Sequence, residues 1–203
     1  CAWPSTYRVV TVTEHGVGDT HIKSVEAGYD QIGLELYSRE ELPGGTDAYR
    51  VKRYDSLGRL QLESIPGPCC ATPTAWIRHV YDALGRRVSV ERPTDQANTT
   101  PVLTRWRYDG LSVTETDPLG RSTTRRHDAL GNVLQVIDPG LTDVDFEHDA
   151  FGNLVKTRDF QGTETVVTYD VRGLRRSLND PDAGRWTYDY FPLGEIRSQT
   201  NAR

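Results

Sequence analysis

The chain has 203 residues, 36% of them hydrophobic, and a formal net charge of −5. The acidic balance argues against nucleic acid as a partner, because a surface that binds nucleic acid is basic. No apolar run is long enough to span a membrane, and aromatic and β-branched residues recur too regularly for a disordered chain. The sequence contains no Met, so we expect a processed product or an internal piece of a longer protein.

One short motif recurs along the chain, and it consists of Tyr or His followed by Asp-x-x-Gly. It begins weakly as "YDQIG" at Tyr29, appears in shortened form as "YDGLS" at Tyr108, and repeats every twenty-one residues from His127 onward. Insertions lengthen the earlier intervals, which places surface loops between copies. The residues of the clear copies, called the YD motif below, are Tyr54, Asp55, Gly58, Tyr81, Asp82, Gly85, His127, Asp128, Gly131, His148, Asp149, Gly152, Tyr169, Asp170, Gly173, Tyr190 and Gly194.

The YD motif has the residue preferences of a β-hairpin turn. Asp at the first position and Gly at the fourth favour a type I turn followed by a left-handed Gly in a bulge. The Asp side chain can accept backbone N–H bonds within such a turn. We therefore expect a positive φ at Gly85, Gly131, Gly152, Gly173 and Gly194.

A second set of turns lies between the motifs and reads "DPLG" at Asp117, "DPG" at Asp138, "DFQG" at Asp159 and "DPDAG" at Asp180. Between turns, six or seven residues remain, which is an ordinary strand length. No stretch has the length and periodicity of a helix. Eight motif copies with two strands each predict about sixteen strands in an antiparallel meander, over residues 25–203, after an N-terminal flanking segment at residues 1–24.

Alternation within the strands predicts one apolar and one polar face. Trp186, Tyr188 and Tyr190 share a face, and the intervening residues, such as Arg185 and Thr187, are polar. The same alternation separates Val144, Phe146 and His148 from Asp143, Asp145 and Glu147. Because wide open sheets twist and curl, we expect a curled ribbon with its apolar face concave and covered by other protein.

Motifs such as "YDALGRRV", "HDALGNVLQVIDPG" and "HDAFGNLVKTRD" resemble the YD repeats of the RHS (rearrangement hot spot) family. The resemblance covers residues 25–203, and the opening stretch is similar to the region before the RHS repeats in Tc-toxin B components and SpvB-like proteins. It implies an all-β ribbon of hairpins forming an arc of an RHS-type hollow shell. In toxins of this family the shell encloses an effector polypeptide, and in teneurin-like relatives the repeats belong to cell-surface proteins.

The family also carries a self-cleaving core segment with a D-P-x-G-L motif. Here "DPLGR" at Asp117 is a turn within the repeats, so no protease residue is transferred to this chain. The resemblance therefore predicts a structural, non-enzymatic segment of a secreted or cell-surface bacterial protein. Its partners would be neighbouring RHS repeats and an enclosed toxin polypeptide.

The sequence also contains residues that could carry other chemistry, and a structural interpretation is favoured for each of them. His127 and His148 could form a metal pair, but equivalent positions lie roughly 9–10 Å apart, too far for one zinc ion, so aromatic replacement of Tyr is favoured. The "DVDFEHD" segment at Asp143 could bind calcium, although a polar strand face is favoured. Recurring Asp residues are explained by turns rather than by glycosidase chemistry. We expect no catalytic residue, no cofactor and no metal.

Carbohydrate binding is the alternative function, as an adhesion module, and an enzyme domain is the third. Trp76, Trp106 and Trp186 could stack on sugars, although filling the apolar face is favoured. Cys1, Cys69 and Cys70 form no CxxC pair, which leaves zinc and redox motifs unsupported. Incidental thiols are favoured over a vicinal disulfide.

Overall fold

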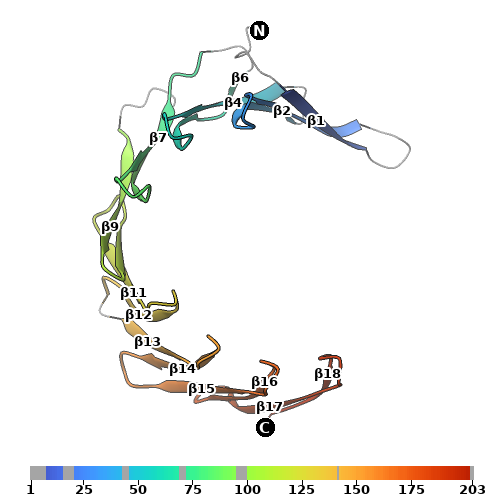
Figure 1. The fold of residues 1–203 in the computed structure, drawn as a ribbon, viewed down its shortest axis with the longest axis vertical. Coiled ribbons are helices and arrows are strands. Elements are labelled where there is room, and N and C mark those ends of the chain that lie inside the picture. The colour runs from blue at the N-terminus through green and yellow to red at the C-terminus, as the bar shows by residue number, and fades with distance from the viewer. Residues whose placement is uncertain are drawn as a thin grey trace. The chain divides into compact units, whose positions relative to one another are not determined.

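The computed structural model describes residues 8–15, 21–42, 46–68, 72–94, 100–140 and 142–201. Within these ranges the chain forms eighteen β-strands and no helix (Figure 1), and the predicted all-β antiparallel fold is confirmed. The chain divides into two compact units, Cys1–Arg105 and Trp106–Arg203. Cys1, Cys69 and Cys70, for which the sequence favours incidental thiols, lie outside the described residues.

The first unit is an antiparallel sheet in which β6 pairs with β4 and the other strands pair in chain order. Its last strand continues into the second unit. The strands are β1 (Arg8–His15), β2 (His21–Tyr29), β3 (Glu35–Leu42), β4 (Thr46–Tyr54), β5 (Leu60–Ser64), β6 (Gly67–Pro68), β7 (Trp76–Tyr81), β8 (Arg87–Arg92) and β9 (Val102–Asp109).

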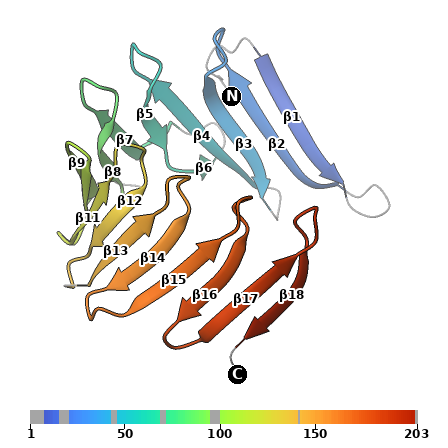
Figure 2. The same ribbon diagram turned by 60° about the horizontal axis from the view of Figure 1, so that its bottom comes forward.

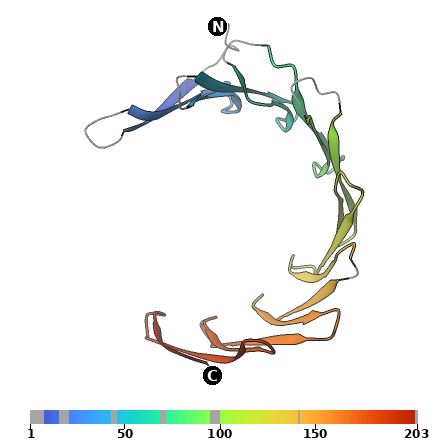
Figure 3. The same cartoon turned by 180° about the vertical axis from the view of Figure 1, so that it is seen from behind.

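The second unit is a meander in which each strand from β10 onward pairs antiparallel with the next. The strands are β10 (Ser112–Thr116), β11 (Ser122–His127), β12 (Val133–Ile137), β13 (Asp143–His148), β14 (Leu154–Asp159), β15 (Glu164–Tyr169), β16 (Arg175–Asp180), β17 (Gly184–Tyr190) and β18 (Ile196–Asn201). Figures 1 and 3 show these strands as one layer from opposite sides.

The turns of the second unit form two rows, one along each of the two sides of the sheet at which the strands end. These two sides are called its edges below. The YD turns, which join β11 to β12, β13 to β14, β15 to β16 and β17 to β18, line one edge (Figure 2). The turns at Asp117, Asp138, Asp159 and Asp180 line the other. Each row therefore presents equivalent residues at intervals of two strands.

The strand count differs slightly from the sixteen expected. β1 precedes the repeats, and β6 is a two-residue strand in the loop after β5; the remaining sixteen strands correspond to the eight expected hairpins. The expected boundary after residue 24 falls inside β2, so the flanking residues supply β1 and the start of the first hairpin. The division into a flanking segment and eight repeats remains a proposal.

The copy at Tyr108 has a different turn from the others. β9 continues through Asp109, and the chain reverses over Gly110 and Leu111, with Gly110 at φ 56°. In the full-length copies, Asp instead opens the turn and a further four residues follow before the next strand begins, as between Asp149 and Leu154. This explains why the "YDGLS" copy is followed by the shortest interval to the next motif.

The predicted alternation of faces is confirmed. In β17 the side chains of Trp186, Tyr188 and Tyr190 are half-buried, whereas Arg185 and Thr187 are exposed. β13 alternates in the same way. Yet the buried apolar core within the described ranges consists only of Tyr37, Tyr49, Ala75, Val90 and Val167. A single layer of strands can shield side chains only against their neighbours, so much of the apolar face lacks a covering layer.

Candidate functional site

The YD turns share one hydrogen-bonding pattern, built on the Asp side chain. In the turn at Asp149, the backbone N–H groups of Phe151 and Asn153 both donate to Asp149 Oδ1 at 2.9 Å. The Gly152 N–H donates to the Asp149 carbonyl at 3.0 Å, and the Asp149 N–H donates to the Asn153 carbonyl at 2.9 Å. The same bonds recur at Asp30, Asp55, Asp82, Asp128 and Asp170.

The predicted glycine conformation is confirmed at all five positions. Their φ values are 80° at Gly85, 91° at Gly131, 83° at Gly152, 78° at Gly173 and 94° at Gly194. In each hairpin the strand register shifts immediately before the Tyr or His of the motif, as between Val80 and Tyr81. The predicted type of turn, a type I turn closed by a left-handed Gly with a bulge, is therefore the one observed.

The residue after Gly explains why the motif continues with Arg or Asn. Arg59 Nε and Arg86 Nε donate to the Oδ2 atoms of Asp55 and Asp82, both at 2.7 Å. Asn132 and Asn153 make the equivalent bond with their Nδ2 atoms, at 2.8 Å and 2.9 Å. Both carboxylate oxygens of each Asp are thus occupied within the turn.

These bonds lower the pKa of the turn carboxyl groups. For Asp128 and Asp149 the main cause is the side-chain amide of the following Asn, and for Asp55 and Asp170 it is the backbone N–H of the residue after Gly. Desolvation opposes the shift. A carboxylate that is held ionised by its own turn is a poor general acid, because that role needs a raised pKa.

The Tyr of the motif ties each hairpin to the one before it. Its hydroxyl donates to the carbonyl of the first residue in the second strand of the preceding hairpin. The bonds run from Tyr54 to Glu35 (2.8 Å), from Tyr81 to Leu60 (2.9 Å), from Tyr169 to Leu154 (2.9 Å) and from Tyr190 to Arg175 (2.8 Å). The motif therefore encodes both a turn and a link between repeats.

The two histidines occupy the Tyr position without reproducing its bond. His127 Nδ1 lies 3.3 Å from the Leu111 carbonyl. His148 Nδ1 is buried and has no hydrogen-bond partner among the described residues. A His ring is too short to place a donor where the Tyr hydroxyl lies, so the link between repeats is weakened at these two positions.

This difference predicts opposite effects from two substitutions. Tyr169→Phe should cost about 1 kcal/mol of unfolding free energy, because it leaves the Leu154 carbonyl without its donor. His148→Tyr should raise stability by a similar amount, since it restores the hydroxyl and removes a buried unpaired nitrogen. Urea unfolding followed by circular dichroism measures both changes.

Tyr188→Phe is the matched control. Tyr188 lies on the same apolar face, and its hydroxyl makes no hydrogen bond to any described residue. Its midpoint should remain within experimental error of the parent chain. Equal losses for Tyr169→Phe and Tyr188→Phe would show that the hydroxyl bond between repeats contributes nothing.

The turns on the other edge use the same Asp chemistry. Asp117 and Asp159 each accept two backbone N–H bonds on Oδ1, and Gly120 and Gly162 have φ values of 81° and 84°. Asp180 accepts N–H bonds from Asp182 and Ala183.

One YD turn lacks the Asp. The turn after Tyr190 has Phe191 in its place and keeps only the backbone bonds.

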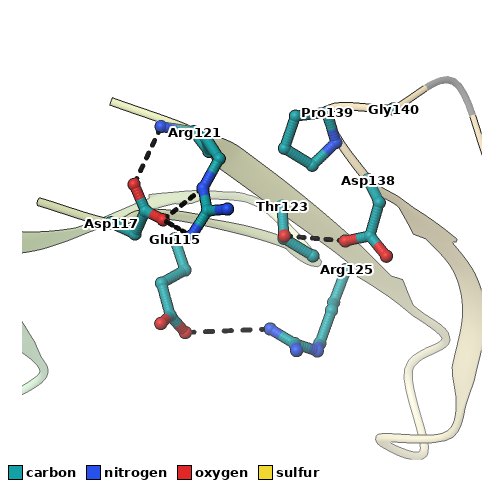
Figure 4. A pocket seen from close by; sticks show the side chains of 8 residues that line it. All are labelled: Glu115, Asp117, Arg121, Thr123, Arg125, Asp138, Pro139 and Gly140. Atoms are coloured by element: carbon teal, nitrogen blue, oxygen red, sulfur yellow. Dashed lines mark hydrogen bonds and ion pairs between the residues drawn. The ribbon is translucent and has the colours of Figure 1, made fainter. Parts of the chain in front are cut away.

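A cavity of about 400 Å³ on the edge of the Asp117 turn gathers three carboxylates and two guanidinium groups (Figure 4). Arg121 donates to Asp117 Oδ2 at 2.7 Å, and Arg125 lies 3.8 Å from Glu115. The Thr123 hydroxyl donates to Asp138 at 2.7 Å. Both guanidinium groups of the lining are thus engaged by carboxylates, and the Asp138 carboxylate is engaged by the Thr123 hydroxyl.

The residues considered for metal, calcium and sugar binding do not come together at one site in the described part of the chain. The described residues contain no group of three or more His, Cys, Asp or Glu side chains that could hold a metal ion. The side chains of Asp143, Asp145 and Glu147 alternate to the exposed face of β13. Trp76 has the Arg53 guanidinium 4.6 Å above its ring, and Trp106 Nε1 donates to Glu115. Across the described ranges, no helix has the length and apolar character to cross a membrane.

Comparison with known proteins identifies the repeat. Residues 111–143, which include the turns at Asp117 and Asp128, match the RHS Repeat family model. These residues therefore resemble an RHS repeat. No match was found among curated proteins.

Solved structures extend the likeness from this RHS repeat to the fold. The chain is similar to crystal structures of TcdB2-TccC3 (TM-score 0.72, 16% identity), TcdB2-TccC3-TEV (0.73, 15%) and TcdB2-TccC3-Cdc42 (0.72, 14%). Each likeness covers 96% of this chain and 12% of the matched chain. The fold of these structures therefore extends along nearly the whole chain, which spans a small part of the length of these proteins.

Proposed function

We propose that this chain is a structural, non-enzymatic segment of a secreted bacterial RHS protein, and that it forms part of the wall of a shell around a toxin polypeptide. The observation that carries the proposal is the single layer of linked hairpins, with an RHS repeat at residues 111–143. A wall needs repeated units that hold one another edge to edge. The bonds from Tyr54, Tyr81, Tyr169 and Tyr190 supply such links.

The sparsely covered apolar face supports a role as a wall. Val167 is the one buried large apolar side chain among the described residues of the second unit, and it is still 8% exposed. Half-buried aromatic residues such as Trp186 and Tyr188 remain partly accessible on their face of the sheet. An apolar surface of this extent normally faces a partner or an interior, and an enclosed polypeptide would provide one.

The occupied carboxylates support a non-enzymatic role. The Asp side chains of the YD motif accept two backbone bonds each, and most also hold an Arg or Asn side chain, so their chemistry is used within the turn. Carbohydrate binding, the alternative, has no specific observation in its favour. Trp76 and Trp106 are both engaged by neighbouring side chains.

Protease protection in the complete gene product tests the proposal. The protein is expressed from its entire reading frame and treated with protease under native conditions. A polypeptide enclosed by the shell should survive, and it should be cleaved when the same material is first unfolded in urea. The same polypeptide expressed without the repeats is the control. Equal cleavage rates with and without the repeats would refute enclosure.

A further inference from the structure

A pair of charged side chains interrupts the apolar face of the second unit, beside the cavity of Figure 4. Arg125 on β11 lies directly opposite Val113 on β10 and Val136 on β12. Residues that lie opposite one another in an antiparallel pair point to the same face of the sheet, so Arg125 projects from between two valines. Glu115, two residues beyond Val113, points to the same face, opposite Thr123.

A later hairpin shows that the fold does not require this charged pair. The hairpin of β14 and β15 has the same turn as that of β10 and β11, and the same link from a Thr hydroxyl to the Asp of the next turn. Yet the positions of Glu115 and Arg125 are held there by Thr157 and Val167. Glu115 and Arg125 therefore serve something other than the turn or the strand pairing.

The Arg125 guanidinium has unused hydrogen-bond donors. Its Nη1 atom lies 3.8 Å from Glu115 Oε2, which is close enough for an ion pair but too long for a hydrogen bond. Arg125 makes no hydrogen bond to any other described residue, and 46% of its side chain is exposed. It thus presents a planar fork of N–H groups to the cavity, a geometry that suits a carboxylate.

Two carboxylate oxygens of the same cavity are available as acceptors. Glu115 Oε2 accepts a hydrogen bond from Trp106 Nε1 at 3.2 Å, and Asp138 Oδ1 accepts one from the Thr123 hydroxyl at 2.7 Å. No donor from the described residues reaches Glu115 Oε1 or Asp138 Oδ2. Both carboxylates are therefore oriented by one oxygen and open at the other.

Charge indicates what kind of ligand would fill the cavity. Asp117 and Arg121 pair with each other at 2.6 Å, so their charges cancel. The remaining charged groups of the lining are those of Arg125, Glu115 and Asp138, with a net charge of −1. The two carboxylates would repel a phosphate or a sulfate. A ligand with one carboxylate and two cationic groups would instead satisfy all three.

We propose that this cavity binds a free basic α-amino acid. The α-carboxylate pairs with Arg125, the α-ammonium with Glu115 and the side-chain cation with Asp138. Because Arg125 and Glu115 lie 3.8 Å apart, two groups that are joined through one carbon atom can reach both. The cavity volume of about 400 Å³ is in the range of small-molecule sites. This binding site goes beyond the proposed function and does not depend on it.

Isothermal titration calorimetry of the purified chain tests the chemistry of the ligand. L-Arginine should bind at least tenfold more tightly than agmatine, which lacks the carboxylate, and than N-acetyl-L-arginine, which lacks the α-ammonium. L-Leucine lacks the side-chain cation and should also bind at least tenfold more weakly. The affinity for L-arginine should fall as the salt concentration rises, because the contacts are ionic.

Two tripeptides distinguish a free amino acid from the end of a polypeptide. Glycyl-glycyl-arginine keeps the carboxylate of its arginine but not the α-ammonium, and arginyl-glycyl-glycine keeps the α-ammonium but not the carboxylate. Both should bind at least tenfold more weakly than L-arginine. A tripeptide that bound as tightly as L-arginine would identify a chain terminus as the ligand and would overturn the inference.

A matched pair of variants locates the site. Arg125→Val introduces the residue that the equivalent position already has in Val167, so the chain should stay folded, and the affinity for L-arginine should fall at least tenfold. Arg176→Val is the control. Arg176 is an exposed arginine outside the cavity, and it lies on the same face because it is two residues from Leu178, which pairs with Val167. The control should bind L-arginine like the parent chain, and circular dichroism checks the folding of both.

Asp138→Asn tests the third contact separately. An Asn side chain keeps an oxygen for the Thr123 hydroxyl but carries no charge. The variant should bind L-leucine like the parent chain and lose most of the preference for L-arginine over L-leucine.

Three further results would overturn the inference: no saturable binding of L-arginine to the folded chain, equal binding of agmatine, or equal losses of affinity in Arg125→Val and Arg176→Val. None of them bears on the proposed shell, which is tested by protease protection. Conversely, a chain that binds L-arginine but protects no polypeptide would remove the shell and leave the amino-acid site in place.

Discussion

Acidification from pH 5 to pH 3 is expected to remove a large part of the chain's stability. The pKa is lowered in the folded state for seven turn carboxyl groups, those of Asp55, Asp82, Asp117, Asp128, Asp149, Asp170 and Asp180. A lowered pKa means that the unfolded chain takes up protons first, near pH 3.9. The stabilisation is therefore complete above that value and is lost as pH falls through the folded-state pKa.

His79 should produce a separate and smaller loss at higher pH. Burial, assisted by nearby Arg87, lowers the pKa of its ring. Because the unfolded chain then binds this proton more readily, stability declines as pH falls below about 6.5. His79→Gln should remove this step and leave the steep acid transition in place, which separates the two causes.

The triple variant Asp128→Asn/Asp149→Asn/Asp170→Asn tests the role of the turns. An Asn side chain can still accept the backbone N–H bonds, but it cannot be ionised. We expect this variant to be less stable than the parent at pH 7 and to lose less stability between pH 5 and pH 3. Thermal unfolding at a series of pH values measures both. A pH dependence as steep as that of the parent would contradict the assignment.

The turns were predictable from sequence because their chemistry is local. Asp and Gly three residues apart specify a hairpin turn, and the structure gives that turn at Asp82, Asp128 and Asp149. The positive φ at Gly85 and Gly152 followed from the same pattern. Alternation of Trp186, Thr187 and Tyr188 likewise predicted the faces of β17, because side chains alternate along any strand.

The contacts between repeats were less predictable, because they depend on strand register and on the placement of neighbouring hairpins. The alternation placed Tyr190 on the apolar face, but it did not identify an acceptor for the Tyr hydroxyl of the motif, such as the Leu154 carbonyl for Tyr169. The exposed apolar residues of the turns were also missed. The sequence shows an apolar residue directly before the turn glycine at Leu130, Phe151 and Leu193. Only the structure shows that these side chains point into solvent.

The shortened copy at Tyr108 shows how insertions and deletions limit a repeat-based prediction. Its Asp109 lies within β9 and not in the turn, because two residues, Gly110 and Leu111, suffice to reverse the chain. In contrast, "FPLG" at Phe191 keeps the full turn without Asp, since the backbone bonds to Glu195 and from Gly194 remain. Gly at positive φ is thus the feature that these unlike copies share.

Replacing three of these glycines is expected to have a large effect on stability. The variant Gly131→Ala/Gly152→Ala/Gly173→Ala places a side chain at φ values of 91°, 83° and 78°. A non-glycine residue in the left-handed region costs on the order of 1 kcal/mol or more. The affected turns are separated by two strands, so the costs should be nearly additive, at about 3 kcal/mol. That is a large fraction of the ~5–15 kcal/mol by which domains are stable.

The cost should come from the backbone alone, and a matched glycine can show this. An added Cβ at Gly152 or Gly173 would lie 3.6 Å or 3.8 Å from the nearest Asn side-chain oxygen, which is ordinary contact, and at Gly131 it would meet nothing within 4 Å. Gly140, in a turn on the opposite edge, also has open space around it but no positive φ. Gly140→Ala should therefore be neutral or slightly stabilising. Urea unfolding of both variants provides the measurement, and a triple variant as stable as Gly140→Ala would show that the left-handed turns do not hold the hairpins together.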